Sequence, residues 1–176
     1  MRVRSNIGAA LLRDWAIRNL PRGSTILDVG CGSGKPVAAA LAEEGFEISG
    51  IDASSKLIAA FRQRFPDART ACEPAQDSDF FGMKFDAVIC IGLLFLLREN
   101  DQKEVIGRVA KALKPRGRFL FTSPRAPLQW ADSLTGRLSL SLGAEEYARL
   151  LRAQGLTLHD CWCDEGENNY FDAQYR

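Results

Sequence analysis

Two patterns of apolar and polar positions alternate along this chain. Short, nearly continuous apolar runs predict buried strands, whereas apolar residues at helical spacing predict helices with one buried face. Strands are predicted at residues 24–30, 46–52, 68–73, 85–92, 118–123, 156–163 and 169–175. Helices are predicted at residues 6–20, 35–45, 54–65, 101–113 and 144–155. Residues 124–142 have no clear period.

The order of these elements predicts an α/β fold. Strands that alternate with helices are joined by right-handed crossovers, which produce a parallel sheet with helices on both faces. The last two strands are joined only by residues 164–168, too few for a helical crossover, so one of them must run antiparallel. We expect a single domain over residues 1–176, a Rossmann-like three-layer sandwich. Its seven-stranded, mostly parallel sheet has one antiparallel strand near the C-terminus.

Composition narrows the choice of partners and compartment. The 176 residues carry 23 basic and 22 acidic side chains, a formal net charge of +1, which gives no reason to expect nucleic acid. No apolar stretch reaches the roughly 18 residues that a membrane span requires, and the first residues lack the features of a signal peptide. Five scattered cysteines, an odd number, predict reduced thiols in the cytoplasm and no metal site.

Three glycines at every second position follow the first predicted strand, in the stretch ILDVGCGSG at residues 26–34. Glycine is required where the backbone takes positive φ or where a ligand lies against it. A phosphate-binding loop is excluded because that motif has glycine in place of Val29 and serine or threonine in place of Pro36. A dinucleotide-binding loop would need glycine at residue 35, which is lysine. Asp52, at the end of the second strand, suits a dinucleotide or any other adenosine ligand.

The spacing D-x-G-x-G-x-G over residues 28–34 resembles the first motif of the class I S-adenosylmethionine-dependent methyltransferases. Further motifs of that family follow in order, with GIDASS at 50–55, FDAVICIG at 85–92 and ALKPRGRFLF at 112–121. The resemblance covers residues 24–165. It implies the fold described above, S-adenosylmethionine as the cofactor and methyl transfer as the activity.

The resemblance also implies roles for individual residues. The backbone of residues 30–32 is expected to lie against the methionine part of the cofactor, and Asp28 to hold its ammonium group. Asp52 is expected to bind the ribose hydroxyls by charge-assisted hydrogen bonds, with Ala53 near the adenine. The complete predicted set of cofactor-binding residues is Asp28, Gly30, Cys31, Gly32, Gly34, Asp52, Ala53, Glu73, Ala75 and Ile91.

The third motif departs from the family pattern. The family has an acidic side chain there that meets the adenine amino group, which implies this role for Glu73. The next residue in the family donates its N–H to the adenine ring, but Pro74 has no N–H. We therefore expect Ala75 or Gln76 to supply that donor.

The acceptor side is predicted from two segments. Residues 91–97, IGLLFLL, lack the Asn- or Asp-Pro-Pro-aromatic motif of DNA amino-methyltransferases and suit a hydrophobic small molecule, with Phe95 as one contact. Residues 123–142 leave the fifth strand on the acceptor side and contain Trp130, and Tyr170 is a further candidate. In-line positioning provides much of the rate of methyl transfer, and a general base is needed only if the acceptor must lose a proton, so the sequence assigns no catalytic residue.

The sequence thus predicts an S-adenosylmethionine-dependent methyltransferase that acts on a small molecule, as a monomer or a homodimer. Two alternatives remain open. One is a non-catalytic domain that binds S-adenosylmethionine and keeps the sheet. The other is a nicotinamide-dependent oxidoreductase of related fold.

Overall fold

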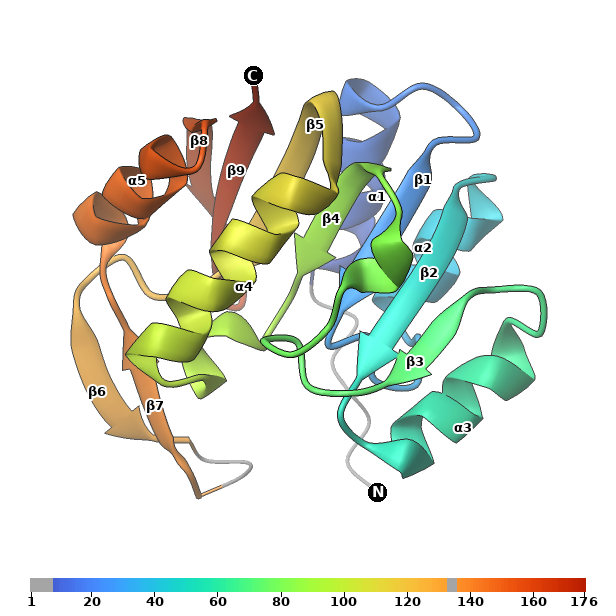
Figure 1. Cartoon of the computed structure of the whole chain (residues 1–176), viewed down its shortest axis with the longest axis horizontal. Helices are drawn as coiled ribbons and strands as arrows, with labels where there is room; N and C mark the ends of the chain where they lie inside the picture. Colours follow the sequence, from blue (N-terminus) through green and yellow to red (C-terminus); the bar gives the residue numbers. More distant parts are fainter. Residues whose placement is uncertain (1–7, 133–135) are drawn as a thin grey trace.

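A seven-stranded sheet forms the centre of the computed structural model, which describes residues 8–132 and 136–176 (Figure 1). The strands lie side by side in the order β3-β2-β1-β4-β5-β9-β8. Their bounds are β1 Thr25–Val29, β2 Glu47–Asp52, β3 Thr70–Cys72, β4 Phe85–Cys90, β5 Leu113–Thr122, β8 Leu156–Cys163 and β9 Asn169–Tyr175. The helices of the described part are α1 Ala9–Asn19, α2 Val37–Glu43, α3 Ser55–Arg64, α4 Glu99–Ala112 and α5 Ala144–Ala153, with short 3-10 helices η1 Phe80–Gly82 and η2 Leu94–Leu96.

One strand of this sheet runs against the others. β1 pairs in parallel with β2 and β4, β2 with β3, and β4 with β5. β9 is antiparallel to both of its neighbours, β5 and β8. Residues 164–168 alone join β8 to β9, so the chain must reverse between them. The predicted antiparallel strand is therefore confirmed, and it lies inside the sheet rather than at its edge.

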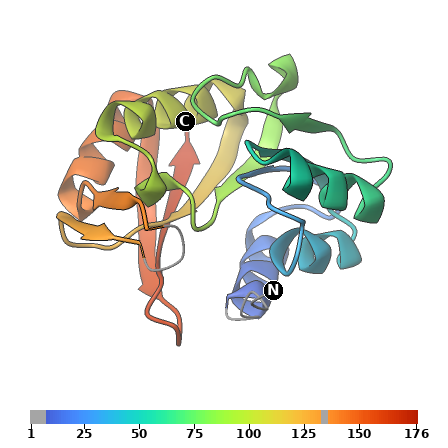
Figure 2. The same cartoon turned by 90° about the horizontal axis from the view of Figure 1, so that it is seen from below.

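Helices cover both faces of the sheet (Figure 2). Helices α1, α2 and α3 pack on one face together with Ile26, and α4 and α5 pack on the other together with Leu27. Both of these neighbouring β1 residues are fully buried. Strands covered on both faces need apolar side chains at consecutive positions, which explains the nearly continuous runs in the sequence. The three-layer α/β prediction is confirmed.

A buried ion pair fastens α1 to the reversed strand. Asp172 of β9 is 2% exposed and accepts hydrogen bonds from Arg118 of β5 and from the indole N–H of Trp15, the latter at 2.9 Å. A carboxylate is tolerated in such a place only when charged and polar partners replace the lost water. This contact fixes α1 beneath β5 and β9.

The segment without a clear period, residues 124–142, contains a β-hairpin. Its strands are β6 Leu128–Ala131 and β7 Leu138–Ser141, which pair antiparallel. Ser139 and Ser141 of β7 are buried, whereas Leu138 is 67% exposed. No regular element was predicted here, and strands of only four residues each are too short to give a clear period.

Candidate cofactor and acceptor site

The parallel strands end at one edge of the sheet, the lower edge in Figure 1 and the nearer one in Figure 2. The segments that leave β1, β2, β4 and β5 therefore meet there. β1 leads to α2 on one face of the sheet, and β4 leads to α4 on the other. In open α/β sheets ligands bind at such a point, because the two connections diverge and leave a crevice between them.

The glycine stretch makes a tight turn directly after β1. Gly30, Gly32 and Gly34 have φ values of 78°, 57° and 80°, which residues with a side chain rarely adopt. The N–H groups of Gly30 and Cys31 both donate to the carbonyl oxygen of Ile51, at 2.8 and 3.0 Å. The turn is therefore fastened to β2, and the positive φ expected of such a stretch is present at all three glycines.

Packing within the chain also requires two of these glycines. A Cβ atom on Gly30 would lie 2.9 Å from Cδ2 of Leu93, and one on Gly34 would lie 2.5 Å from the Phe65 ring. The sequence pattern suggested a ligand at these positions, because partners so distant along the chain leave no local signal. Gly32 differs from these two in that its N–H donates to an acidic side chain, Asp52.

Asp52 holds the glycine turn from the end of β2. Its Oδ2 accepts from the N–H of Gly32 at 2.9 Å, and its Oδ1 accepts from the N–H of Ser54 at 2.8 Å. Ser54 in turn caps α3, its hydroxyl accepting from the N–H of Leu57. The half-buried carboxylate thus joins the two segments that the sequence predicted to bind the cofactor.

Asp28 lies two residues before the turn and inside the sheet. It is 4% exposed, and its strand neighbours are Gly50 of β2 and Ile89 of β4. Burial, and secondarily the charge of Asp28, raise the pKa of the Cys90 thiol, which therefore stays protonated. The carboxyl group of Asp28 is thus buried in β1, two residues before the glycine turn begins.

The segment after β3 reaches the same edge. The N–H of Glu73 donates to the carbonyl oxygen of Asp52 at 3.2 Å, and Pro74 accepts from the N–H of Asp77 at 3.1 Å. Ala75 is buried in the core. The side-chain oxygen of Gln76 is buried without a hydrogen-bond partner in the described part of the chain. Which of these groups meets an adenine stays a prediction.

The end of β4 leaves open space. The N–H of Gly92 donates to Oγ1 of Thr122, the last residue of β5, at 2.8 Å. A Cβ atom on Gly92, which has a φ of 72°, would meet nothing within 4 Å. The neighbouring Ile91 is half-buried against the core beneath α1–α3. Thr122 was not among the predicted site residues, although a hydroxyl near the end of a predicted buried strand was a signal for it.

Of the three side chains predicted to contact the acceptor, Phe95 and Trp130 lie next to each other, whereas Tyr170 makes its contacts elsewhere. The rings of Phe95, in η2, and Trp130, in β6, lie 5.5 Å apart at an angle of 38°. Tyr170 is 2% exposed, its hydroxyl donates to Asp164 at 2.9 Å, and its ring stacks on Trp162. Its burial argues against contact with an acceptor, because its hydroxyl and ring are already occupied by the protein.

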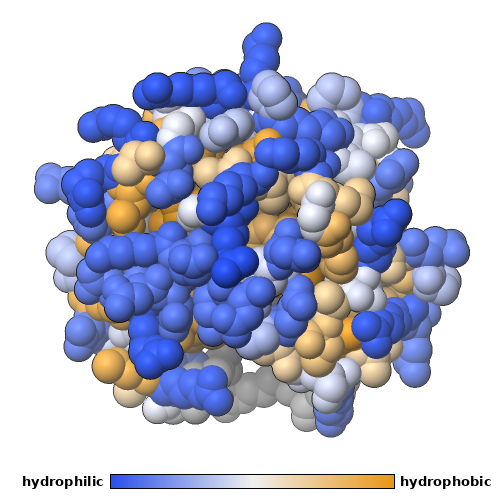
Figure 3. Space-filling view, in the orientation of Figure 1, coloured by the Kyte–Doolittle hydropathy of each residue, from blue (hydrophilic) through white to orange (hydrophobic). Residues whose placement is uncertain are grey.

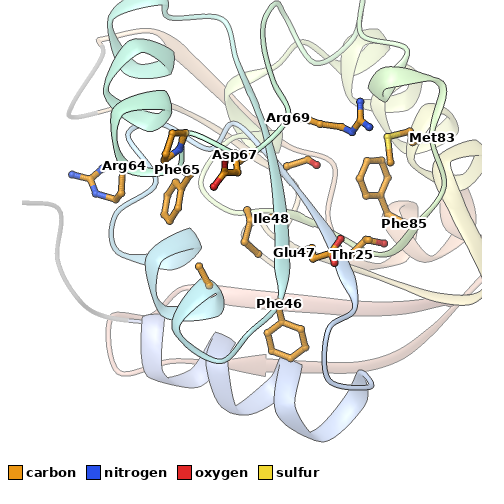
Figure 4. Close-up of a pocket in the computed structure, with 14 residues that line it drawn as sticks. Thr25, Phe46, Glu47, Ile48, Arg64, Phe65, Asp67, Arg69, Met83 and Phe85 are labelled. Carbon is orange, nitrogen blue, oxygen red and sulfur yellow. The ribbon is translucent and has the colours of Figure 1, made fainter.

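A separate cavity of about 490 Å³ lies at the opposite edge of the sheet (Figure 4). Thr25, Glu47 and Phe85, the first residues of β1, β2 and β4, line it. The connection from α3 to β3, residues 64–69, forms another wall. No predicted cofactor-binding residue lines this cavity, so it is distinct from the site at the glycine turn. Within residues 8–132 and 136–176, no cluster of three or more His, Cys, Asp or Glu side chains could hold a metal ion.

Known proteins resemble this chain along much of its length. A family model described as a methyltransferase domain matches residues 26–117. YqeM of Bacillus subtilis, which is named as a methyltransferase, is 36% identical over 112 residues, 61% of this chain and 45% of YqeM. The ubiquinone biosynthesis O-methyltransferase of Coxiella burnetii is 27% identical over 154 residues, 82% of this chain and 63% of that protein. The chain thus spans less than two thirds of either relative.

A solved structure agrees with the fold. That of the 1,6-didemethyltoxoflavin-N1-methyltransferase of Burkholderia thailandensis, with 1,6-didemethyltoxoflavin and S-adenosylhomocysteine bound, has a TM-score of 0.77. The match has 23% identity and covers 96% of this chain and 76% of that one. This likeness concerns the fold alone, while the family model covers more than half of the chain. The chain belongs to the class I S-adenosylmethionine-dependent methyltransferase family.

Proposed function

We propose that this protein transfers a methyl group from S-adenosylmethionine to a small-molecule acceptor. The observation that carries the proposal is the hydrogen bond of 2.9 Å from the N–H of Gly32 to Oδ2 of Asp52. It joins the glycine turn after β1 to the acidic end of β2, the two features expected to contact the amino acid and ribose parts of this cofactor. A nicotinamide dinucleotide is disfavoured because lysine occupies residue 35.

The residues at this edge fit the cofactor. Asp52 uses one lone pair of each oxygen for backbone N–H groups, which leaves capacity to accept from ribose hydroxyls. Ala53 beside it is exposed, and the space at Gly92 lies across the sheet at the end of β4. The carboxyl group of Asp28 could accept a hydrogen bond from an ammonium group.

The main contribution of the protein to methyl transfer at this site is to position the acceptor. S-adenosylmethionine, when bound, supplies an electrophilic methyl group on a positively charged sulfur. The protein has to hold the acceptor in line with that group. Phe95 and Trp130 carry no titratable group, so their part is to orient the acceptor and exclude water. We assign no general base: His159 is exposed on β8, which two strands separate from β4.

An aromatic or otherwise apolar small molecule suits this acceptor side best. The paired rings of Phe95 and Trp130 offer apolar contact area with defined orientation. The names of two similar proteins, the 1,6-didemethyltoxoflavin-N1-methyltransferase and the ubiquinone biosynthesis O-methyltransferase, support a small-molecule acceptor.

We further propose a cytoplasmic location. All five cysteines carry free thiols, as expected in a reducing compartment. Across the described ranges, the helices are too short or too polar for one of them to traverse a bilayer.

Calorimetry with S-adenosylhomocysteine and with NADH tests the proposed cofactor. We expect saturable binding of S-adenosylhomocysteine with a dissociation constant in the micromolar range, and none of NADH. A parallel incubation with S-adenosylmethionine carrying a labelled methyl group and a panel of aromatic phenols and amines is expected to label an acceptor. Binding of NADH alone would favour the oxidoreductase alternative. If S-adenosylhomocysteine binds but no compound in a broad metabolite extract receives the labelled methyl group, the alternative of a non-catalytic S-adenosylmethionine-binding domain is favoured.

Trp130→Ala is expected to raise the KM for the labelled acceptor at least about five-fold, because it removes a ring from the acceptor wall. The affinity for S-adenosylhomocysteine should change less than about two-fold, since the cofactor lies over β1 and β2. Gln129→Ala, at the exposed neighbouring position of β6, is the matched control and should leave both quantities unchanged. Equal KM values for Trp130→Ala and wild type would remove the hairpin from the acceptor site.

A further inference from the structure

The hairpin that carries Trp130 depends on the rest of the protein for its position. Two-stranded hairpins are at best marginally stable by themselves, and β6 and β7 have only four residues each. Hydrophilic side chains cover most of the face in Figure 3, and the exposed large apolar residues of the described part are Ile17, Leu128 and Leu138. Two of these three lie on the hairpin. The hairpin thus leaves Leu128 and Leu138 exposed to solvent, so the burial of these two side chains does not hold the hairpin in place.

A fully buried amide side chain ties the hairpin to α4, in addition to the hydrogen bond of 2.7 Å from Oγ of Ser141 to the carbonyl oxygen of Pro124. Gln102, on α4, is 0% exposed. Its Nε2 donates to the carbonyl oxygens of Leu97 at 2.9 Å and of Leu140 at 2.8 Å. Its Oε1 accepts from the hydroxyl of Tyr147 at 2.7 Å. Both amide hydrogens and the amide oxygen are thus used, which offsets the cost of burying the group.

The chemistry of the partners fixes the orientation of this amide. Carbonyl oxygens only accept hydrogen bonds, so the nitrogen of Gln102 must face Leu97 and Leu140. The oxygen must then face Tyr147, whose hydroxyl can donate. Neither a carboxylate nor an apolar side chain at residue 102 could satisfy the same three partners.

Tyr147 extends the network to two further elements. Its hydroxyl lies 2.9 Å from Oγ of Ser123, just after β5, and accepts from the N–H of Leu142 at 3.3 Å, just after β7. Its ring packs edge-on against Phe121 and Phe171 of the central sheet. Burial raises the pKa of this hydroxyl, so it remains a donor at neutral pH. The network is anchored on the sheet itself.

The two carbonyls that Gln102 binds belong to the two segments of the acceptor side. Leu97 directly follows η2, which carries Phe95. Leu140 lies on β7 and pairs with Gln129, the neighbour of Trp130 on β6. A single side chain therefore bridges the backbones that carry the two neighbouring rings.

We propose that Gln102 is a positioning residue for the methyl acceptor: it holds the β6–β7 hairpin against η2 and so sets the placement of Trp130 over Phe95. The relevance to the acceptor rests on the function proposed above. The effect of Gln102 on the position of the hairpin does not rest on that function, and this effect can be measured without any ligand.

Two variants of Gln102 test this role. Gln102→Met keeps the approximate shape but leaves the carbonyls of Leu97 and Leu140 without a donor. Gln102→Glu keeps an acceptor for Tyr147, but a carboxyl group carries at most one hydrogen, so at least one of the two carbonyl oxygens loses its donor. Gln63→Met, at an exposed position of α3, is the matched control. Tyr147→Phe removes the hydroxyl and leaves both carbonyl bonds of Gln102, so it should disturb the hairpin less than either Gln102 variant.

Fluorine NMR of protein labelled with 5-fluorotryptophan reports directly on the surroundings of Trp130. The chain has three tryptophans, and Trp130→Phe assigns the signal of interest. We expect the Trp130 signal to shift or broaden in Gln102→Met and Gln102→Glu, while those of Trp15 and Trp162 stay in place. Amide exchange over β6 and β7 should accelerate at least ten-fold relative to β1 in the same sample.

Two results would overturn the proposal. One is an unchanged Trp130 signal with unchanged exchange of the hairpin in a folded variant. The other is an equal change of all three tryptophan signals and of every strand, which is what a general loss of stability produces. If Gln102→Met does not fold, Gln102→Glu decides between the same results. Wild-type protein that fails to bind S-adenosylhomocysteine would contradict the proposed function and leave these measurements standing.

Discussion

Gly32→Val is expected to abolish binding of S-adenosylhomocysteine in calorimetry, a loss of more than about 100-fold or roughly 2.8 kcal/mol. Gly32 has a φ of 57°, a conformation that a β-branched residue strongly disfavours. Forcing the residue out of that conformation turns its N–H away from Asp52, which it meets at 2.9 Å. The turn and the ribose-binding carboxylate would be displaced together.

Strain at a glycine also lowers stability, so the comparison needs a glycine of similar conformation elsewhere. Gly23 has a φ of 79° and lies just before the other end of β1, where a Cβ atom would meet nothing within 4 Å. Gly23→Val should lower the melting temperature as Gly32→Val does, yet bind S-adenosylhomocysteine normally. A folded Gly32→Val protein with wild-type affinity would show that the glycine stretch is a turn without a ligand.

Asp52→Ala is the second variant expected to weaken cofactor binding strongly. We expect it to weaken S-adenosylhomocysteine binding by about 1.5–3 kcal/mol, the scale of hydrogen bonds to a charged group. The variant loses the acceptor for ribose and also leaves the N–H groups of Gly32 and Ser54 without their partner. Stability in urea should therefore fall as well, by about 1–2 kcal/mol.

Glu47→Ala separates the local effect from a general one. Glu47 is an exposed acidic residue at the opposite end of the same strand. Glu47→Ala should change neither the free energy of S-adenosylhomocysteine binding nor the free energy of unfolding by more than about 0.5 kcal/mol, as is usual for exposed positions. If Asp52→Ala binds S-adenosylhomocysteine as tightly as Glu47→Ala does, the carboxylate does not contact the ligand.

The central sheet was predictable from the sequence for a physical reason. Strands covered on both faces carry apolar residues at consecutive positions, as β1 and β4 do, and such runs are visible without any knowledge of distant contacts. The reversal at β9 followed from the length of residues 164–168 alone. These features are local, so a single sequence was sufficient to predict them.

Features that depend on distant partners were not predictable in the same way. The β6–β7 hairpin was missed because its two strands have only four residues each, and the inward position of Ser139 and Ser141 depends on partners outside the hairpin. Gln102 has the sequence pattern of an exposed helix residue, yet partners 38 and 45 positions away in the chain bury and satisfy it. No local pattern indicates that the hydroxyl of Tyr170 donates to Asp164, so its burial was not predictable either.

An amide NMR titration with S-adenosylhomocysteine locates the ligand most directly. If the glycine turn holds the cofactor, the amide signals of Gly30, Gly32, Ala53 and Gly92 should move or broaden on binding. The signals of Thr25, Glu47 and Phe85, which line the cavity at the opposite edge of the sheet, should stay in place. Absence of binding, or perturbation confined to that opposite edge, would contradict a cofactor site at the carboxyl ends of β1, β2 and β4.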